Sequence, residues 1–368
     1  MNMNQQRIEF LDGLRGLAII FVMLFHAYAR YPTFVPFGSE FSEIPLFSKG
    51  YYGVNLFFLI SGFVILMTLE KTNNFFDFML RRWIRLFPAM LVCTIIIYST
   101  AFFFMNGPKG MRYGKDLLSG LLFIKPSTLG HILHSPQGQL ESSFWSLYVE
   151  VEFYLLIASL YFFIGRNRAL IVIATIFLMY KAIFLIPVGL YQGPLISYIQ
   201  GIEWFLVVLN AQYLGWFVAG SLFYIYYKQP KIIVLMTALT LAFLSAAEGG
   251  FFSVPATAPS LVIILFVVSV LSNNIKKILS NKILLFIGFI SYPLYLLHEN
   301  MLVSLVVKVG LYTPWVPHVL MPIFPILFVI AVGYLIAKYL EPWVRDLIKP
   351  YFKQLHSMTL GKSSEAST

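Results

Sequence analysis

Long apolar segments alternate with short polar ones along the whole chain. A transmembrane helix needs about 20 largely apolar residues, and the sequence offers many such windows. We predict ten spans, which are residues 10–31, 51–70, 87–106, 144–165, 169–189, 204–227, 232–248, 256–272, 283–305 and 317–340. The stretch 112–130 holds the run LLSGLLFI, which is too short to cross, so we assign it to a long, partly interfacial loop. The pattern predicts an all-α, polytopic membrane protein.

The composition agrees with this class. Of the 368 residues, 59% are hydrophobic and 11% are charged, whereas a soluble domain averages about 25% charged residues. We expect residues 1–345 to form one integral-membrane domain and 346–368 a cytoplasmic tail whose last part is disordered. The first span exceeds the roughly 7–15 apolar residues of a secretory signal. A single cysteine, Cys93, excludes an intrachain disulfide and a Cys-rich metal site.

The basic residues orient the predicted bundle, because loops rich in Lys and Arg stay cytoplasmic. An even number of spans puts both termini on one side, and most basic residues fall inside if that side is the cytoplasm. The smaller outer set is Arg30, Lys49, Lys109, Arg112, Lys115, Lys125 and Lys308. We therefore predict that both termini are cytoplasmic. The net charge of +10 is then explained by topology, and no nucleic-acid partner is needed.

Polar side chains from five predicted helices lie at a similar depth in the outer half of the membrane. They are His26, Asn55, Glu150, Asn210 and His298. Helical rise places the two histidines and Glu150 about 8–10 Å from the outer ends of their spans. An ionisable side chain near the bilayer centre costs on the order of 2.5–3.5 kcal/mol, so such residues are functional candidates. Their common depth indicates a site.

Each of these residues also has a purely structural interpretation. A lone histidine in a membrane can simply hydrogen-bond a neighbouring helix, and Asn55 and Asn210 are typical of amides that join helices. Glu150 needs a proton or a partner at its depth. Glu152, two residues further, faces roughly the other side of the helix, so we favour Glu150 for the site. Glu299 is next to the predicted interface, where solvation alone explains it.

A second polar cluster is predicted on the inner face. Asp12 and Arg15 are three residues apart and would be neighbours on a helix. Arg81, Arg82 and Arg85 precede the third span, and the last two lie close together if that segment is helical. Arginines at this position are ordinary positive-inside residues when taken alone. Their alternative role is an anion clamp, because guanidinium groups bind phosphate in a bidentate manner.

The spacing of Arg15 and His26 links the two clusters. Eleven residues separate them on one predicted helix, which is a rise of about 16 Å within roughly 20° of the same face. A ligand with phosphates at one end and a reactive group on a long thin arm fits this span. Coenzyme A thioesters have that shape.

Six segments resemble those of the integral-membrane acyltransferase 3 family. The opening RIEFLDGLRGLAIIFVMLFHA is similar to its first signature, which ends in an Arg-x10-His pair. The others follow in family order and are YYGVNLFFLISGFVI, RRWIRLFPA, FWSLYVEVEFYLL, ISYPLYLLHEN and YLEPWVR. The matches extend from residue 7 to 345. The chain departs from the family where Glu150, Val151 and Glu152 replace a common Glu-Glu-Gln.

The resemblance implies transfer of an acyl group, usually acetyl, from cytoplasmic acyl-CoA to a hydroxyl of an extracytoplasmic carbohydrate. Such acceptors include O-antigen of lipopolysaccharide, exopolysaccharide, peptidoglycan and lipid-linked glycans. It also implies acetyl-CoA as a substrate rather than a resident cofactor, no metal, and a bacterial inner membrane as the location. Within the family an essential role belongs to the histidine that matches His26, and the Arg-x-x-Arg pair is implicated as well.

We expect His26 to act as general base or as an acyl relay, since histidine titrates near neutrality. Glu150 would fix its tautomer from the far ring nitrogen, Asn55 would stabilise the oxyanion, and His298 belongs to the same catalytic group. Arg15, Arg82 and the neighbouring basic residues would hold the donor. A transporter or flippase of a lipid-linked sugar is the alternative. The sequence lacks the internal repeat that many transporters have.

Overall fold

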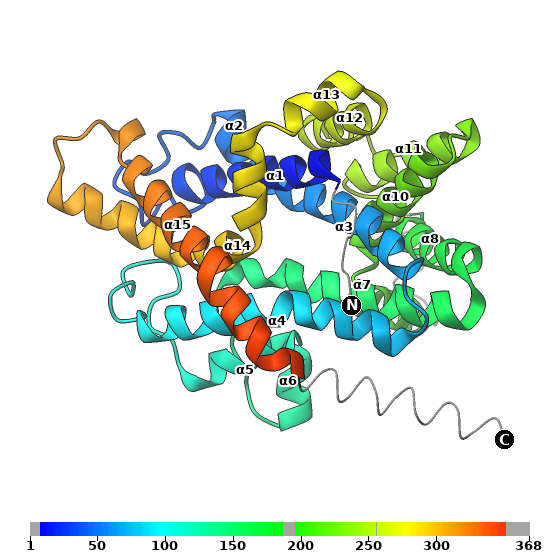
Figure 1. Ribbon diagram of the computed structural model, residues 1–368, viewed down its shortest axis with the longest axis horizontal. Coiled ribbons are helices and arrows are strands. Elements are labelled where there is room, and N and C mark those ends of the chain that lie inside the picture. Colours follow the sequence, from blue (N-terminus) through cyan, green and yellow to red (C-terminus); the bar gives the residue numbers. More distant parts are fainter. Residues whose placement is uncertain (1–7, 184, 187–195, 255, 351–368) are drawn as a thin grey trace. The chain divides into compact units, whose positions relative to one another are not determined.

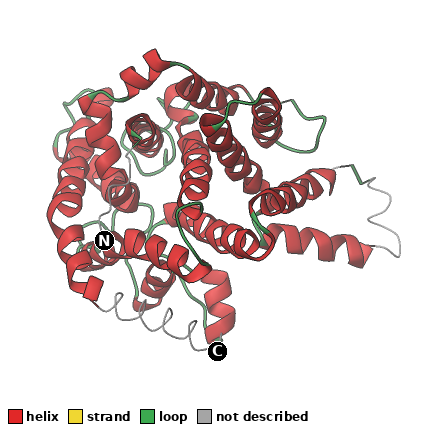
Figure 2. Ribbon diagram, turned by 45° about the vertical axis from the view of Figure 1, so that its right-hand side comes forward, coloured by secondary structure: helices red, strands yellow, loops and turns green. Residues whose placement is uncertain are grey.

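The computed structural model describes residues 8–183, 185–186, 196–254 and 256–350. The elements of this part are helices and no strands, joined by turns and loops (Figure 1, Figure 2). The all-α class is therefore confirmed. The end of the predicted span 169–189 and the last part of the predicted tail lie outside the described residues.

Within the described residues, five helices are long and apolar enough to cross a membrane. They are Glu9–Tyr28 (α1), Gly50–Leu69 (η1 and α3), Ser142–Ile164 (η3 and α7), Lys282–Tyr312 (α14) and His318–Pro350 (η5, α15 and η6 with the helical residues 341–350 that follow). The number rises to seven if two bent pairs each count as one span. These pairs are α9 (Ile196–Val208) with α10 (Ala211–Lys228), bent by 49°, and α12 (Thr257–Leu271) with α13 (Asn273–Leu279), bent by 108°. The protein has the helices of a multi-pass membrane protein, while ten spans and cytoplasmic termini stay predictions.

The third predicted span differs from the helix that the structure forms. α4 runs from Phe75 to Ser99 rather than over 87–106. It begins early because the Asn74 side chain caps it, accepting a hydrogen bond from the Asp77 N–H at 2.8 Å. The predicted loop 112–130 contains only short helices, η2 (Gly114–Asp116), α5 (Leu117–Leu122) and part of α6 (Pro126–Leu133). The remaining helices are α2 (Pro45–Ser48), α8 (Arg166–Ile183) and α11 (Ile232–Ala246).

The chain divides into two compact units. Unit 1 comprises Met1–Val22, Lys49–Lys71 and Val149–Gly288. Within it α3 packs closely on α10, because glycines remove the side chains at the crossing. A Cβ atom added at Gly62 would lie 2.0 Å from the carbonyl oxygen of Phe217, and one at Gly220 would lie 2.1 Å from that of Leu59. Small residues of this kind let backbones approach in membrane helices.

Unit 2 comprises Met23–Ser48, Thr72–Tyr148 and Phe289–Thr368. Its described part joins α4 to α14 through polar contacts in an otherwise apolar interface. The Tyr292 hydroxyl donates to the carbonyl oxygen of Leu86 at 3.1 Å, and the Cys93 sulfur lies 4.0 Å from the carbonyl oxygen of Pro293. The histidines predicted for the site both belong to this unit.

Substituting Gly62→Ala or Gly220→Ala should lower the melting temperature of the detergent-solubilised protein. The added methyl group meets backbone oxygen, which cannot move aside like a side chain, so we expect a loss of about 1–3 kcal/mol. The matched control is Gly201→Ala in α9, where no atom lies within 4 Å of the added Cβ. The close α3–α10 packing is wrong if all three variants melt alike.

Candidate active site

The structure brings two of the predicted site residues, His26 and His298, into direct contact. His26 lies in the last turn of α1 and His298 lies in the middle of α14. Nδ1 of His26 is 3.2 Å from Nε2 of His298, with the ring planes at 80°. The residues are 8% and 0% exposed. Two histidines from distant parts of the sequence thus form one buried pair.

A backbone carbonyl sets the hydrogen positions of this pair. Nδ1 of His298 lies 2.8 Å from the carbonyl oxygen of Tyr295. A carbonyl only accepts, so this nitrogen must carry the proton, and Nε2 of the neutral ring is left as an acceptor. Nδ1–H of His26 then donates to it. In this neutral tautomer the lone pair of His26 is on Nε2, which makes Nε2 the basic atom of the pair.

Glu299 supplies a buried carboxylate next to the pair. It is 1% exposed, and it accepts hydrogen bonds from the Tyr31 hydroxyl and, at 2.5 Å, from the Ser143 N–H. It interacts electrostatically with both His26 and His298. The interpretation of Glu299 as solvated is wrong, because α14 continues to Tyr312 instead of ending at residue 305. The residue is therefore well inside the helix.

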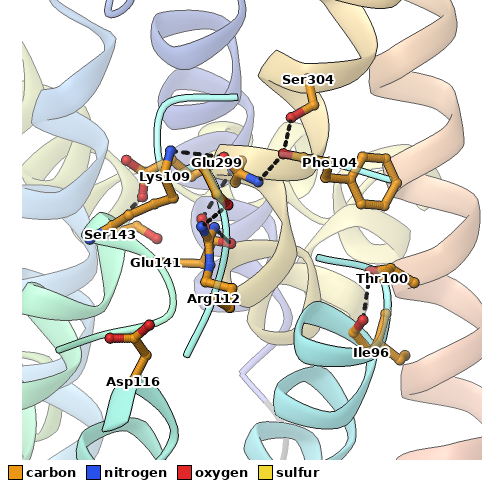
Figure 3. Close-up of polar contacts among 12 residues, drawn as sticks. Ile96, Thr100, Phe104, Lys109, Arg112, Asp116, Glu141, Ser143, Glu299 and Ser304 are labelled. Carbon is orange, nitrogen blue, oxygen red and sulfur yellow. Dashed lines mark hydrogen bonds and ion pairs between the residues drawn. The ribbon is translucent and has the colours of Figure 1, made fainter. Parts of the chain in front are cut away.

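Asn300, the next residue of α14, holds the loop after α4 and the segment before η3 in place. Its partners Lys109, Glu141 and Phe104 are labelled in Figure 3. Its backbone N–H donates to a Glu141 oxygen at 3.1 Å, and its side-chain oxygen accepts from the Lys109 N–H at 3.0 Å. Its amide nitrogen donates to the carbonyl oxygen of Phe104 at 2.9 Å, which the Ser304 hydroxyl also contacts at 2.8 Å. The loop after α4 is thereby fixed on α14.

An ion pair is buried beneath this loop. Arg112 and Glu141 lie 3.1 Å apart, and each side chain is 2% exposed. Burial and the nearby Glu299 raise the pKa of Glu141 to about 8, while Arg112 opposes this shift. Burial and Glu299 likewise raise the pKa of Tyr31. No pattern in the sequence indicates this pair, because Arg112 is assigned as an ordinary charge of a predicted outer loop and its partner is 29 residues away.

Glu150 and Asn55, also predicted for the site, belong to unit 1. The Glu150 carboxylate accepts hydrogen bonds from the Ser61 and Tyr154 hydroxyls, both at 2.5 Å. Asn55 is half-buried in α3. In the described residues Nδ1 of His26 faces an imidazole, so the role of Glu150 beside that ring stays a prediction. The oxyanion role of Asn55 also stays a prediction.

Asn210 serves as a link between helices. Its amide donates to a Glu152 oxygen, and the residue adopts a left-handed conformation with φ 51° at the break between α9 and α10. This contact agrees with the structural interpretation of the amide. It also gives Glu152 a partner.

The three predicted arginines Arg81, Arg82 and Arg85 lie in the helix α4, so Arg82 and Arg85 have the helical spacing that the prediction assumed. Arg81 forms a bidentate ion pair with Asp77 at 3.0 and 3.1 Å. The Arg82 side chain is buried, with its guanidinium 5.8 Å from the centre of the Phe78 ring, whereas Arg85 is exposed. Arg82 and Arg85, three residues apart, lie on one side of the helix.

In unit 1 the first turns of α1 carry the predicted Asp12–Arg15 pair, and their side chains are joined at 2.8 Å. This neighbour relation is confirmed. The binding of a donor by these residues stays a prediction. Among the residues that the structure describes, no group of three or more His, Cys, Asp or Glu side chains is placed to share a metal ion.

The family is decided by comparison with known sequences. A model of the acyltransferase domain matches residues 8–342, which is nearly the whole chain. The chain belongs to the acyltransferase 3 family. With its apolar helices, this makes it a multi-pass membrane protein.

The chain is similar to two O-acetyltransferases over different shares of its length. The O-acetyl transferase of Shigella phage Sf6 is 26% identical over 55% of this chain and 62% of its own length. O-acetyltransferase OatA of Staphylococcus aureus strain NCTC 8325 is 26% identical over 80% of this chain and 50% of its own. The chain thus spans between half and two thirds of the curated relatives named here. No solved structure matches it.

Replacing Arg112 by Met should destabilise the family member strongly. The change leaves Glu141 buried without its cation, and breaking a buried pair in this way costs about 3–5 kcal/mol. A carboxyl with a raised folded pKa contributes stability below its unfolded value and loses it as pH rises through the folded one. In the wild type this loss is complete near pH 8, whereas in the variant the pKa of Glu141 is higher still and the loss continues. The deficit of the variant should therefore grow as the pH rises past 8, in thermal unfolding at pH 7, 8.5 and 9.5.

The control for Arg112→Met is Lys109→Met, which removes one positive charge from the same loop. Lys109 contributes a backbone N–H to the network, and that bond survives the change. An equal melting temperature for the two variants at pH 8.5 would contradict the buried pair.

Proposed function

We propose that this acyltransferase 3 member transfers an acetyl group from cytoplasmic acetyl-CoA to a hydroxyl of an extracytoplasmic carbohydrate. The observation that carries the proposal is the hydrogen-bonded series from the Tyr295 carbonyl through His298 to His26. It leaves the lone pair of neutral His26 on Nε2, which supports a role for this atom as the base. The printed names of the relatives, O-acetyl transferase and O-acetyltransferase, support acetyl as the group and oxygen as its acceptor.

The chemistry needs a base more than it needs an activated donor. A thioester is already reactive, whereas a sugar hydroxyl is a weak nucleophile. In the proposed step Nε2 of His26 takes the hydroxyl proton while the oxygen attacks the acetyl carbonyl carbon. The new C–O bond forms, the C–S bond breaks, and coenzyme A leaves as a thiol with the proton from the imidazolium. His298 keeps the ring of His26 in position throughout.

A relay through His26 is a variant of the same proposal. Nε2 would then attack the thioester itself, the C–S bond would break, and coenzyme A would leave as the thiolate. In a second step the sugar hydroxyl would take the acetyl group from the imidazole, its proton would pass to Nε2, and the thiolate would finally accept that proton. The relay suits a donor and an acceptor that never meet. Both forms place the reacting atom on Nε2.

The donor phosphates would be held by the inner arginines. Arg82 and Arg85 lie on one side of α4, and guanidinium groups suit phosphate oxygens. Arg81, oriented by Asp77, would add positive charge from an ion-paired position. A donor-binding role of Arg15 with Asp12 stays a prediction from the sequence. A bacterial inner membrane would give the donor and the acceptor opposite sides of the protein.

His26→Ala and His26→Gln should lower acetyl transfer by about 10²–10⁴-fold, because a general base contributes that much. His298→Ala should cost less, on the order of tenfold, since the base remains but its tautomer is no longer fixed. The assay uses membranes that contain surface glycan and receive radiolabelled acetyl-CoA. Full transfer by His26→Ala would refute both the base and the relay.

Two further measurements test the mechanism and the function separately. Radioactive label trapped on the wild-type protein supports the relay, and its absence at all times favours direct transfer. Mass spectrometry of surface glycans from cells with and without the gene should show a difference of one acetyl group. Glycans of equal mass in both cells would instead favour the flippase alternative.

Arg82→Ala combined with Arg85→Ala should raise the KM for acetyl-CoA. Each lost charged hydrogen bond costs about 1.5 kcal/mol or more, which corresponds to at least about tenfold in affinity. Lys349→Ala is the control, since Lys349 is an exposed cation of the same unit that pairs with Asp346. An unchanged KM in the double variant would exclude α4 as the donor-binding helix.

A further inference from the structure

The buried carboxylate of Glu299 has no assigned role in the proposed reaction. It lies one residue after His298 on α14 and interacts electrostatically with His26. We propose that Glu299 is a positioning residue that acts through His26, by stabilising the protonated imidazole that forms during transfer. The inference rests on the proposed function, because it concerns the same base.

The surroundings of Glu299 call for a positive charge. A buried carboxylate is costly unless it is paired, and the two groups that donate to it, the Tyr31 hydroxyl and the Ser143 N–H, are neutral. The nearby cation Arg112 is bonded to Glu141 at 3.1 Å. An imidazole that takes a proton from a substrate supplies the charge at the moment of reaction.

Tyr31 connects the carboxylate to the end of α1. Its ring lies 6.0 Å from that of His26, and its hydroxyl donates to Glu299. The guanidinium of Arg30 lies 5.7 Å from the centre of the same ring. The contact keeps the loop after α1 and the carboxylate together beside the histidine.

The charged and titratable groups around this carboxylate come from five segments. They are His26 on α1, Arg30 and Tyr31 after α1, His298 on α14, Arg112 in the loop after α4, and Glu141 before η3. During the attack the proton moves from the hydroxyl to Nε2 of His26, and it later leaves with the thiol of coenzyme A without reaching Glu299. Glu299 stays ionised, so a contact between ionic groups forms where water is scarce and the interaction is strong.

Two substitutions separate the charge of Glu299 from its hydrogen bonds. In Glu299→Gln the amide oxygen can still accept from Ser143, and the amide nitrogen can donate to Tyr31, because a hydroxyl accepts as well as donates. The charge is lost while both contacts remain. Tyr31→Phe does the reverse, since it removes one contact and keeps the carboxylate.

We expect Glu299→Gln to lower kcat for acetyl transfer about tenfold or more, with the KM for acetyl-CoA changed by less than about twofold. Without the negative charge the imidazolium is less stable, so the acid limb of the pH–rate profile should move to lower pH. Tyr31→Phe should keep the wild-type position of that limb. A loss of rate in both variants with no displacement of the limb would mean a structural clamp and overturn the proposal.

An equilibrium measurement makes the test independent of turnover. Deuterium exchange at C2 of histidine depends on protonation and can be followed by mass spectrometry of the peptide that contains His26. Its pH midpoint should move to lower pH in Glu299→Gln and stay in place in Tyr31→Phe, with both variants melting near the wild type.

An unchanged midpoint in Glu299→Gln overturns this inference whatever the activity is. Failure of the proposed function is seen separately, as wild-type protein that transfers no acetyl group.

Discussion

Three consecutive polar residues of α14, His298, Glu299 and Asn300, impose the constraint on which the rest of the described site depends. All three are buried, so each needs a hydrogen-bonding partner. Successive residues of a helix point about 100° apart, and the three therefore meet different segments. His298 meets the end of α1, Glu299 meets the loop after α1 and the start of η3, and Asn300 meets the loop after α4. One turn of helix thus fixes the surroundings of His26.

The buried charges of Glu141, Glu299 and Arg112 influence one another. Glu141 and Glu299 are both buried, and the repulsion between them is one cause of the raised pKa of Glu141. Arg112 offsets the charge of Glu141 through a direct bond. Two buried acids next to a single buried arginine leave the region receptive to a further proton or cation. The raised pKa of Glu141 reflects this, and under the proposed mechanism the histidine pair is a second group that can take up a proton. The ion pair under the loop is thereby connected with the base at the end of α1.

The sequence predicted much of the fold, because long apolar runs have few alternatives to helices. It also placed His26 and His298 at one depth, and the structure puts them in contact. The burial of Glu299 was not predicted, because it depends on where α14 ends and hydropathy defines helix ends poorly. The Arg112–Glu141 pair was not predicted for another reason. Both residues are in polar loop sequence, where burial depends on tertiary contacts that no periodic pattern reports.

Under the proposed mechanism, His298 and Glu299 have different roles toward His26. A carboxylate bonded directly to Nδ1 of His26 would stabilise the imidazolium before any substrate arrived. His298 is neutral in the assigned tautomer, so it orients the ring without favouring the charged form in the resting state. Glu299 lies further away, and its attraction becomes large only when the proton has moved. An interaction that strengthens on the way to the transition state accelerates the step, whereas one already present in the ground state does not.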